Sequence, residues 1–555
     1  MTDTRPVSAP LDPSDPYARE AQTFPRLAPA MAARVAAYGT EERLPAGTLV
    51  FERGQRRVDF FLVLEGAIEI AGIGDDGRRS VVTVHGAYQF TGDVDLFTDR
   101  QILISGRTLV DSRVVRVDRA SFRRMIMAES DIGEILMRAF ILRRVGLLRH
   151  MQGGVILIGP KHGADTLRIQ RFLTRNHYPH RLLDTEVDPA AEGFVECFSL
   201  SPGHLPVVIS SIDQVLRNPS TALLADELGL TERLDPDLVH DVVVVGAGPA
   251  GLAAAVYGAS EGLDTLIIEA VAPGGQAGTS SKIENYLGFP TGISGEALAG
   301  RAQVQAQKFG AKLAVARAVT ALDCGNPPYR LRLEDGSSVA TRAIVIATGA
   351  RYRLLDAPGF ERYAQAIHYA ATAMEAQLCL KEPVVVVGGG NSAGQAAVFL
   401  SRSASHVHVL VRAGGLAATM SDYLIQRIDA SPNITLHAYC AITALHGDEG
   451  LREVTWTNRE TGKETTLTTR NIFAMIGAAP NTGWLGGCLA LDASGFVRTG
   501  HDDEGRPLDS PYATSQPGIY AVGDVRAGSV KRVASGVGEG SVVVQAIHRY
   551  LNPGE

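Results

Sequence analysis

The sequence has only five cysteines in 555 residues, and no two of them form a C-x-x-C pair. They are scattered along the chain without the spacing of zinc ligands, at Cys197, Cys324, Cys379, Cys440 and Cys488. We therefore expect no metal site, no disulfide scaffold and no internal relay of cysteine pairs. This cysteine usage is typical of a reducing compartment and predicts a cytoplasmic protein.

Long apolar runs and blocks of basic residues are also missing. No apolar stretch approaches the ~20 residues needed to cross a bilayer, so no membrane span is expected. The formal net charge is −7, which makes nucleic acid a poor candidate partner. The first residues, MTDTRPVSAPLDPSDPYARE, lack a secretion signal and predict a disordered tail over residues 1–29.

A chain of this length is too long for one hydrophobic core, so several domains are expected. Residues 30–150 alternate short apolar strands with glycine turns and end in a helical stretch, which predicts a β-roll closed by helices. The segment LVFERGQRRVDFFLVLEGAIEIAGIGDDGRRSVVTVHGAYQFTGDVDLF resembles cyclic-nucleotide-binding domains of the catabolite-activator type. A β-rich accessory domain of another kind is the alternative.

The resemblance is incomplete at the phosphate-binding cassette. In that family a Glu holds the ribose hydroxyl, and a later Arg pairs with the cyclic phosphate. Here Asp93 follows Gly92 in place of the Glu, and Ile102–Ile104 occupy the expected place of the Arg, with Arg100 beside them. Because a phosphate without its bidentate guanidinium is poorly held, we expect a regulatory or docking domain, with a nucleotide-like effector left open.

Residues 151–235 predict a small α/β domain. GVILIGP is a buried strand, ADTLRIQRFLTRNHYPH an amphipathic helix, and HRLLDTE and HLPVVIS are two more strands. Their order resembles a glutaredoxin or thioredoxin fold, with Pro206 where that family has a cis-proline. The place of the family's C-x-x-C reads GPKHGADT, so this domain cannot exchange thiols. We expect a docking or spacer domain, and a generic α/β linker is the alternative.

A complete dinucleotide-binding pattern begins at Asp241. DVVVVGAGPAGLAAAVYGASEGLDTLIIEA reads as a strand, a glycine-rich turn, a helix and a second strand that ends in Glu269. Gly246 permits the tight turn, Gly248 lets backbone approach a pyrophosphate, and Gly251 lets the helix pack on the strand. Glu269 is placed to accept hydrogen bonds from a ribose diol.

A second unit of this kind begins at Pro383, where PVVVVGGGNSAGQAAVFLSRSASHVHVLVR again places a glycine-rich turn between strand and helix. Two such units imply two dinucleotides. The candidate NAD(P)-binding residues are Gly388, Gly389, Gly390, Asn391, Ser392, Ala393 and Arg412.

Residues 238–552 resemble the low-molecular-weight thioredoxin reductases, which are flavin-dependent pyridine-nucleotide disulfide oxidoreductases. The resemblance rests on PGGQAGTSSKIENYLGFPTGISGEAL, GGGNSA, PGIYAVGDV and KRVASGVGEG. It implies an FAD domain split over residues 238–360 and 475–555, an NAD(P) domain over 361–474, and a homodimer. Together with the first glycine-rich unit, it predicts FAD binding by Gly246, Gly248, Pro249, Ala250, Gly251, Glu269, Gly275, Gln276, Asn285, Thr348, Gly349, Gly523, Asp524, Lys531, Arg532 and Val533.

Those reductases carry a redox C-x-x-C shortly before the second glycine-rich turn. Here HYAATAM occupies that place, and Ala370 and Ala373 stand where the two cysteines would be. Alanine cannot carry electrons to a protein disulfide, so we do not expect thioredoxin reduction by the usual route. The nearby Cys379 is expected to be a packed apolar cysteine. His368 is a candidate acid or base, with a structural histidine as the alternative.

The sequence favours NADPH over NADH. In the family, a His-Arg-Arg run after the second strand of the nucleotide domain holds the 2′-phosphate. Here the strand ends VLVRAGG, with Arg412 as its guanidinium and no acidic residue to prefer the NADH diol. A solvated surface charge is the alternative for Arg412.

These features predict a multidomain α/β protein with a β-roll, a small thioredoxin-like unit and two Rossmann-like domains. We expect an FAD-dependent oxidoreductase that accepts hydride from NADPH or NADH. The sequence does not identify its electron acceptor, and redox proteins are among the candidates. Two alternatives stay open: a redox or nicotinamide sensor built on the flavin core, and a thioredoxin reductase that works by an unusual route.

Overall fold

The computed structural model describes residues 15–73, 79–98, 100–150, 154–188, 190–191, 202–211, 214–280, 282–369, 371, 373–448 and 450–553. The chain forms two compact units. Unit 1 holds the described residues up to Asp235 together with Glu269–Ala272 and Val304–Ala318, and unit 2 holds the others. In these ranges no helix has both the length and the apolar character needed to span a bilayer.

The N-terminal segment departs from the expected disordered tail. Residues 1–14 lie outside the described part, but a 3-10 helix, η1 (Pro16–Arg19), and α1 (Glu20–Thr23) follow directly. The Tyr17 ring stacks on His150 with centroids 4.7 Å apart, and the buried Asp15 carboxylate lies 2.9 Å from the His150 Nε2 atom. These contacts, made with a residue far along the chain, order a stretch whose composition alone predicts disorder.

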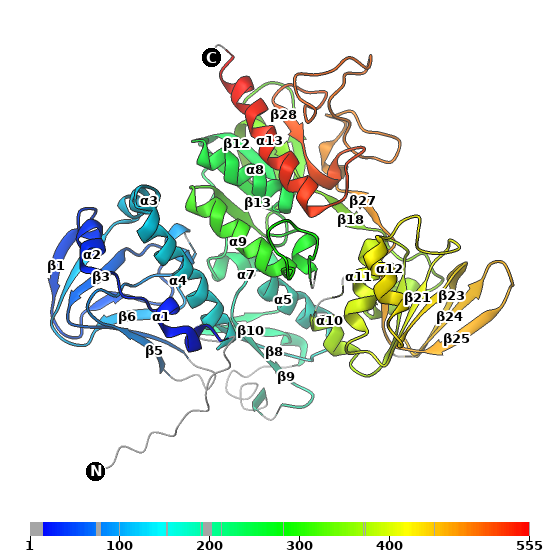
Figure 1. Ribbon diagram of the computed structural model, residues 1–555, viewed down its shortest axis with the longest axis horizontal. Helices are drawn as coiled ribbons and strands as arrows, with labels where there is room; N and C mark the ends of the chain where they lie inside the picture. Colours follow the sequence, from blue (N-terminus) through cyan, green and yellow to red (C-terminus); the bar gives the residue numbers. More distant parts are fainter. Residues whose placement is uncertain are drawn as a thin grey trace. The chain divides into compact units, whose positions relative to one another are not determined.

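The β-roll of unit 1 consists of two antiparallel sheets and the helices around them (Figure 1). One sheet has the strand order β1-β7-β3 and the other β2-β6-β4-β5. Because successive side chains of a strand point to opposite faces, Phe60 and Leu62 of β3 pack among the helices, while Phe61 and Val63 pack between the sheets. The elements are α2 (Pro29–Ala36), β1 (Thr40–Leu44), β2 (Leu49–Phe51), β3 (Phe60–Glu65), β4 (Ile68–Ile73), β5 (Arg79–His85), η2 (Val94–Phe97), β6 (Ser105–Thr108), β7 (Ser112–Val117), α3 (Arg119–Ala128) and α4 (Ser130–Arg149).

The second part of unit 1 is a four-stranded sheet of order β11-β10-β8-β9. β8 and β9 are parallel, as a strand–helix–strand connection requires, and β10 is antiparallel to β8. The Leu205–Pro206 peptide is cis, as expected from the sequence. The elements of this part are β8 (Val155–Gly159), α5 (Ala164–Arg175), β9 (His180–Asp184), η3 (Pro202–His204), β10 (Val207–Ser211), β11 (Gln214–Arg217) and α7 (Thr221–Glu227). The residues of one more strand, β14 (Lys312–Val315), also belong to unit 1 but not to this sheet.

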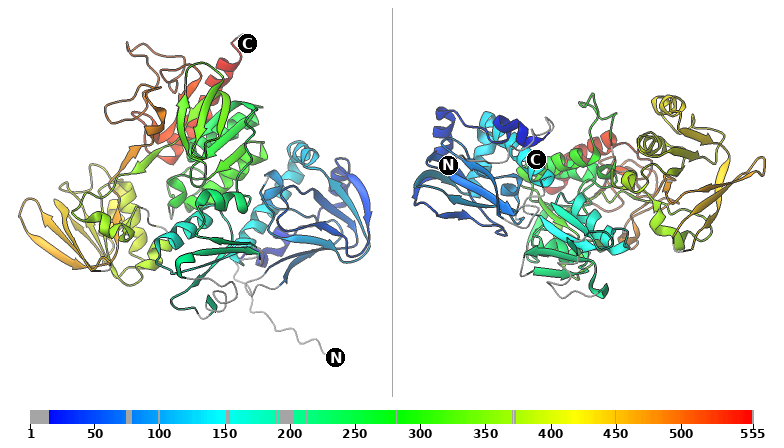
Figure 2. Two further views of the ribbon diagram at one scale, coloured as in Figure 1. Left: turned by 180° about the vertical axis from the view of Figure 1, so that it is seen from behind. Right: turned by 90° about the horizontal axis from the view of Figure 1, so that it is seen from below.

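The first sheet of unit 2 joins segments that are far apart in sequence. β12 is parallel to both β13 and β17, β16 and β15 continue the sheet in antiparallel fashion, and β28 pairs with β17. Helices α8 and α13 lie side by side (Figures 1 and 2), so closely that a Cβ atom on Gly540 would lie 2.1 Å from the Ala250 oxygen. The elements are β12 (Val239–Val245), α8 (Pro249–Ser260), β13 (Thr265–Glu269), η4 (Ala277–Thr279), α9 (Gly295–Lys308), β15 (Val319–Asp323), β16 (Tyr329–Leu333), β17 (Ser338–Ile346), β28 (Ile519–Ala521), η7 (Gly523–Val525) and α13 (Val533–Leu551).

The second sheet of unit 2 is parallel, with strand order β19-β26-β20-β21-β22. The run VVVV of β20 is buried, as is typical of a parallel strand covered on both faces. The elements here and beside it are β18 (Ala350–Tyr352), η5 (Phe360–Ala366), β19 (Ile367–His368), α10 (Ala373–Leu378), β20 (Pro383–Val387), α11 (Asn391–Leu400), β21 (His406–Leu410), α12 (Asp422–Asp429), β22 (Ile434–His437), β23 (Cys440–His446), β24 (Glu453–Asn458), β25 (Glu464–Thr468), β26 (Ile472–Ala474), β27 (Ala478–Pro480) and η6 (Gly483–Leu485).

A disulfide corrects the expectation of a chain without cysteine pairs. Cys324 and Cys488 are bonded within unit 2, with Cα atoms 6.0 Å apart and 164 positions between them in sequence. Cys324 follows β15 directly, and Cys488 follows η6. Sequence spacing reveals only local pairs, whereas this pair is formed by the path of the chain.

Candidate functional site

The first glycine-rich turn has the geometry of a pyrophosphate cradle. Gly246 has φ 105°, a conformation that favours glycine, and a Cβ atom on Gly251 would lie 1.9 Å from the Gly246 oxygen. Gly248 is the N-cap of α8 and gives it no side-chain cap, while a Cβ atom on Gly248 would meet nothing within 4 Å. The turn therefore leaves open space at a helix N-terminus, where a phosphate group fits.

Predicted FAD residues from three other segments converge on this turn. A Cβ atom on Gly246 would lie 3.0 Å from the Thr348 Cα atom, and one on Gly275 would lie 3.1 Å from the Gly248 Cα atom. A Cβ atom on Gly523 would lie 2.9 Å from the Cβ atom of Ala250. Because the backbones approach this closely, the turn, the PGGQ segment, the strand end at Thr348 and the late Gly-Asp form one site.

Hydrogen bonds between backbone and side chains hold the segments in place. The Thr348 hydroxyl donates to the Asn481 oxygen at 2.9 Å, and the Asn481 side-chain amide donates to the Thr348 oxygen at 2.9 Å. The Gln276 amide donates to the Ala350 oxygen. Gly349 has φ 60° in the turn beside Thr348. Asn481 was not predicted from the sequence, because its role depends on a segment 133 positions away.

Glu539 is a second residue that sequence reasoning missed. Its buried carboxylate accepts from the Gly523 amide at 2.6 Å and lies 2.7 Å from the Arg526 guanidinium. The neighbouring Asp524 has its pKa raised above the ordinary value, mainly because burial penalises its charged form. A charged residue within the glycine-rich run GVGEG was the available signal in the sequence.

Other predicted FAD residues lie outside this set of close approaches. Glu269 ends β13, and its carboxylate accepts from the Val271 amide at 3.0 Å. Asn285 is exposed, and the Lys531 ammonium lies 4.8 Å from the centroid of the Phe496 ring. Two predicted residues flank the beginning of α13, Arg532 as its N-cap and Val533 as its first residue, while Pro249 is the first residue of α8.

The second glycine-rich turn has a similar construction. A Cβ atom on Gly388 would lie 2.2 Å from the Met475 oxygen, and α11 begins at Asn391 without a side-chain cap. The Thr419 hydroxyl donates to the Gly389 oxygen at 2.7 Å, and the Asn391 side chain accepts from the Ser421 amide at 2.7 Å. In α11, Ser392 is exposed and Ala393 is buried, while Gly390 is the N-cap. Arg412 is exposed just after β21 and has no ion-pair partner among the described residues.

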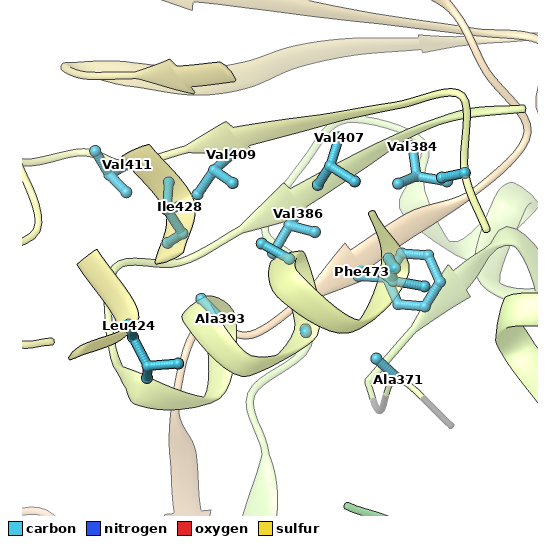
Figure 3. Close-up of a cluster of buried hydrophobic side chains, with 14 of the residues drawn as sticks. Ala371, Val384, Val386, Ala393, Val407, Val409, Val411, Leu424, Ile428 and Phe473 are labelled. Atoms are coloured by element: carbon cyan, nitrogen blue, oxygen red, sulfur yellow. The ribbon is translucent and has the colours of Figure 1, made fainter. Parts of the chain in front are cut away.

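Ala371 stands between the two positions where the family's redox cysteines would be expected, and it lies in an apolar core. Ala371 is 9% exposed and belongs to a cluster with Val384, Val386 and Phe473 (Figure 3). Ala370 lies outside the described residues, and Ala373 begins α10 with a side chain that is not described. An alanine methyl in this cluster contributes packing and no redox chemistry.

His368 and Cys379 are interior residues of the same domain. His368 is 4% exposed, its Nε2 atom lies 2.9 Å from the Asn471 Oδ1 atom, and its ring contacts Phe473. His368 therefore links β19 to Asn471, the residue directly before β26. We do not assign it to catalysis. Cys379 is fully buried, and burial raises its pKa to about 11, so the thiol is protonated and inert, as expected.

The phosphate cassette of the β-roll differs from the sequence expectation. Gly92 and Asp93 line a cavity, but Arg100 does not, because its guanidinium points to the Asn176 oxygen at 3.5 Å. The Asp93 carboxylate accepts from the Asp95 amide at 2.8 Å and lies 3.1 Å from the Arg144 guanidinium. The guanidinium that does line the cavity is Arg143 of α4, which the sequence did not reveal because the helix lies far beyond the cassette.

The described residues hold no cluster of three His, Cys, Asp or Glu side chains suited to a metal ion.

Two stretches of the chain match known protein families. Residues 240–540 match the family described as Pyridine nucleotide-disulphide oxidoreductase, and residues 41–129 match the Cyclic nucleotide-binding domain.

Individual relatives are thioredoxin reductases. That of Mycoplasmopsis pulmonis is 32% identical over 308 residues, which are 55% of this chain and 95% of that protein. The NADPH-dependent thioredoxin reductase 3 of Arabidopsis thaliana is 32% identical over 323 residues, and the match spans 57% of this chain but 59% of that protein. The solved structure of Lactococcus lactis thioredoxin reductase in the FR conformation matches with 29% identity and a TM-score of 0.52, covering 57% of this chain and 99% of that one.

The family match, the relatives and the two glycine-rich cradles all concern the same half of the chain. The protein therefore belongs to the pyridine nucleotide-disulphide oxidoreductase family, as a thioredoxin reductase-like oxidoreductase that uses FAD and a nicotinamide nucleotide and carries an N-terminal domain of the cyclic-nucleotide-binding type.

Proposed function

We propose that this enzyme oxidises NADPH and passes the electrons to an acceptor outside the chain, without a disulfide at the position where its relatives' family carries one. The observation that supports this proposal is the apolar packing of Ala371, next to the two alanines that replace the cysteines. A redox protein, a quinone or oxygen would serve as the acceptor. Bound FAD supplies the chemistry, because it accepts a hydride and releases electrons singly or in pairs.

The chain's own residues bind and orient the two nucleotides. We assign the FAD pyrophosphate to the N-terminus of α8, beside Gly246, Gly248 and Gly275, and the adenosine ribose to Glu269. The half-buried Asp524 follows Gly523, whose backbone lies close to Ala250, and is assigned to the flavin end of the dinucleotide. The nicotinamide nucleotide is assigned to the turn from Gly388 to Gly390 and the N-terminus of α11.

Arg412 supports NADPH over NADH. It is exposed after β21, where a nucleotide on the adjacent turn would extend its ribose, and no ion pair among the described residues occupies its guanidinium. A 2′-phosphate gains a bidentate partner there, whereas a ribose diol gains only a weak one. The family resemblance further implies a homodimer, which light scattering of the purified protein tests.

The first experiment is an anaerobic titration of the FAD-loaded protein with NADPH and then NADH, following the flavin band near ~450 nm. We expect bleaching that is complete after about one equivalent of NADPH, because flavin alone takes up two electrons. If bleaching were complete only after about two equivalents, a Cys324→Ser and Cys488→Ser double variant would be titrated as well. A return to one equivalent in that variant would identify the disulfide as a second electron store. Absence of bleaching would move the sensor alternative ahead.

A second experiment restores the missing pair. Ala370→Cys combined with Ala373→Cys is expected to produce disulfide reductase activity with thioredoxin in an insulin-coupled assay, and the unaltered protein is expected to lack it. Ala373→Cys alone is the control, since one thiol cannot form the intramolecular disulfide. Turnover by the unaltered protein at the rate of the double variant would contradict the proposal and support thioredoxin reduction by another route.

A further inference from the structure

A cavity in the β-roll has apolar walls where a cyclic nucleotide would need polar ones. The cavity and its open mouth enclose about 630 Å³. Ile102, Leu103 and Ile104 line it at the expected place of the cassette arginine, and Phe51 and Val82 line it from neighbouring strands. Each oxygen of the Asp93 carboxylate already has a protein partner, the Asp95 amide on one and Arg144 on the other, so this group is held by its own domain.

Arg143 of α4 reaches this cavity from the helical side. It is 6% exposed, and it donates from Nε to the Thr23 oxygen at 2.9 Å and from Nη1 to the oxygens of Phe90 and Gly92 at 3.1 and 2.8 Å. Its Nη2 atom is buried and has no hydrogen-bond partner among the described residues. A buried donor of a charged group without a partner is costly, which points to a ligand that supplies the missing acceptor.

Arg143 makes no direct ion pair among the described residues, although the charge of Asp93 acts on it. Of the lining carboxylates, Asp59 lies 2.6 Å from the Arg116 guanidinium, and Asp93 lies 3.1 Å from that of Arg144. No carboxylate of the described residues lies within ion-pair distance of Arg143. Its guanidinium instead faces aromatic rings, at 4.7 Å from the Phe90 centroid and 5.5 Å from that of Phe24.

His85 adds a second polar atom to the same cavity. It is 2% exposed, and its Nδ1 atom has no partner among the described residues. Burial, and secondly the Arg143 charge, hold the pKa of His85 well below its usual range, so the imidazole is neutral and its Nδ1 atom donates a hydrogen bond in the tautomer that carries the proton there. The cavity thus combines one guanidinium with an unpartnered nitrogen, one neutral imidazole and walls of aliphatic and aromatic side chains.

We propose that the β-roll cavity binds a small hydrophobic monocarboxylate, with the carboxylate on Arg143 and His85 and its aromatic or branched body against the apolar wall. A carboxylate would supply the acceptor that the buried Arg143 Nη2 atom lacks, and a hydrocarbon body needs no polar partner from Ile102–Ile104. A cyclic nucleotide would bury its ribose and base edges against that wall without partners.

The test measures binding of phenylacetate, indole-3-acetate and their neutral amides to the FAD-loaded full chain by isothermal titration calorimetry. Cyclic AMP serves as the competing ligand. We expect both acids to bind saturably, each at least roughly tenfold more tightly than its amide, and cyclic AMP not to displace them. Because the acid and its amide have nearly the same shape, this comparison isolates the charge in the unaltered protein.

Variants locate the charge. Arg143→Gln is expected to weaken binding of the acids by at least roughly tenfold, while Arg138→Gln, which changes an exposed arginine on the same helix, leaves it unchanged. Since Arg143 also holds three backbone oxygens, Thr83→Phe provides an independent variant. Thr83 lines the cavity on β5, and the larger ring is expected to abolish binding without touching the guanidinium. The proposal fails if neither acid saturates below about 10 mM, if the acids bind no more tightly than the amides, or if cyclic AMP displaces them.

Discussion

Removing the disulfide between Cys324 and Cys488 is expected to lower the thermal stability of unit 2. The bond closes a loop of 164 positions and ties the segment after β15 to the segment after η6. Both cysteines are half-buried, so serine at these positions leaves little empty space and buries little uncompensated polarity. The effect of a double Cys→Ser variant is therefore mainly that of releasing the cross-link.

The size of the effect follows from the loop length. In the chain-entropy account, a cross-link over a loop this long stabilises the folded state by about 5 kcal/mol, and measured disulfides typically contribute about 2–4 kcal/mol. For domains of 150–250 residues, each kcal/mol corresponds to roughly 2–4 °C in Tm. Unit 2 is larger than these domains, so the smaller conversion applies and a fall of roughly 4–8 °C is expected.

The assay is thermal unfolding followed by flavin fluorescence, with and without dithiothreitol. Reduction should lower the Tm of the unaltered protein by roughly 4–8 °C. The double variant should have the lower Tm from the start, and the reductant should not change it. Thiol titration in denaturant should reveal two more thiols after reduction than before. The reasoning is refuted if all five cysteines titrate without reduction, or if the reductant shifts the double variant as much as the unaltered protein.

Three other perturbations test the nucleotide sites and the second sheet of unit 2. Gly251→Ala would place a Cβ atom 1.9 Å from the Gly246 oxygen, so the purified protein should lose most of its flavin, measured as the ratio of absorbance near ~450 nm to that at ~280 nm; full flavin content would refute the steric argument. Arg412→Ala should raise the KM for NADPH roughly tenfold and leave that for NADH unchanged, and equal changes for both nucleotides would refute phosphate recognition by this residue. Burial and neighbouring histidines lower the pKa of His408 to about 4, against about 6.5 when unfolded, so its contribution to stability is present above about pH 6.5 and is lost as the pH falls toward 4. His408→Gln should therefore flatten the fall in urea midpoint between pH 7 and pH 5, and an unchanged slope would show that other groups cause it.

The parts of the fold that depend on near neighbours in the chain were predictable. The turn needs glycine at Gly251 because the Gly246 oxygen lies 1.9 Å from where a Cβ atom would be, a constraint that acts over five residues. The alternation of buried and exposed residues likewise predicts strands, and the strand–turn–helix order predicts nucleotide binding. The replacement of the expected C-x-x-C by alanines is read from the sequence in the same way, since one short motif carries it.

The parts that depend on distant contacts were not predictable. Residues 16–23 are helical although the composition around them predicts disorder; Tyr17 stacks on His150, and composition contains no record of that partner. The guanidinium that lines the β-roll cavity is that of Arg143 in α4. The cassette pattern had suggested Arg100, which lies much earlier in the chain.

The amino-acid sequence by itself determined the two nucleotide-binding turns, the strands around them and the absence of a C-x-x-C, because sterics and periodicity act between residues close in the chain. Only the tertiary structure decided which segments meet: Gly275 and Thr348 at the first turn, Cys324 with Cys488, and Arg143 at the cavity wall. The physical reason is that such contacts are set by how whole sheets and helices pack, so a residue's partner is chosen by the path of the chain rather than by its neighbours.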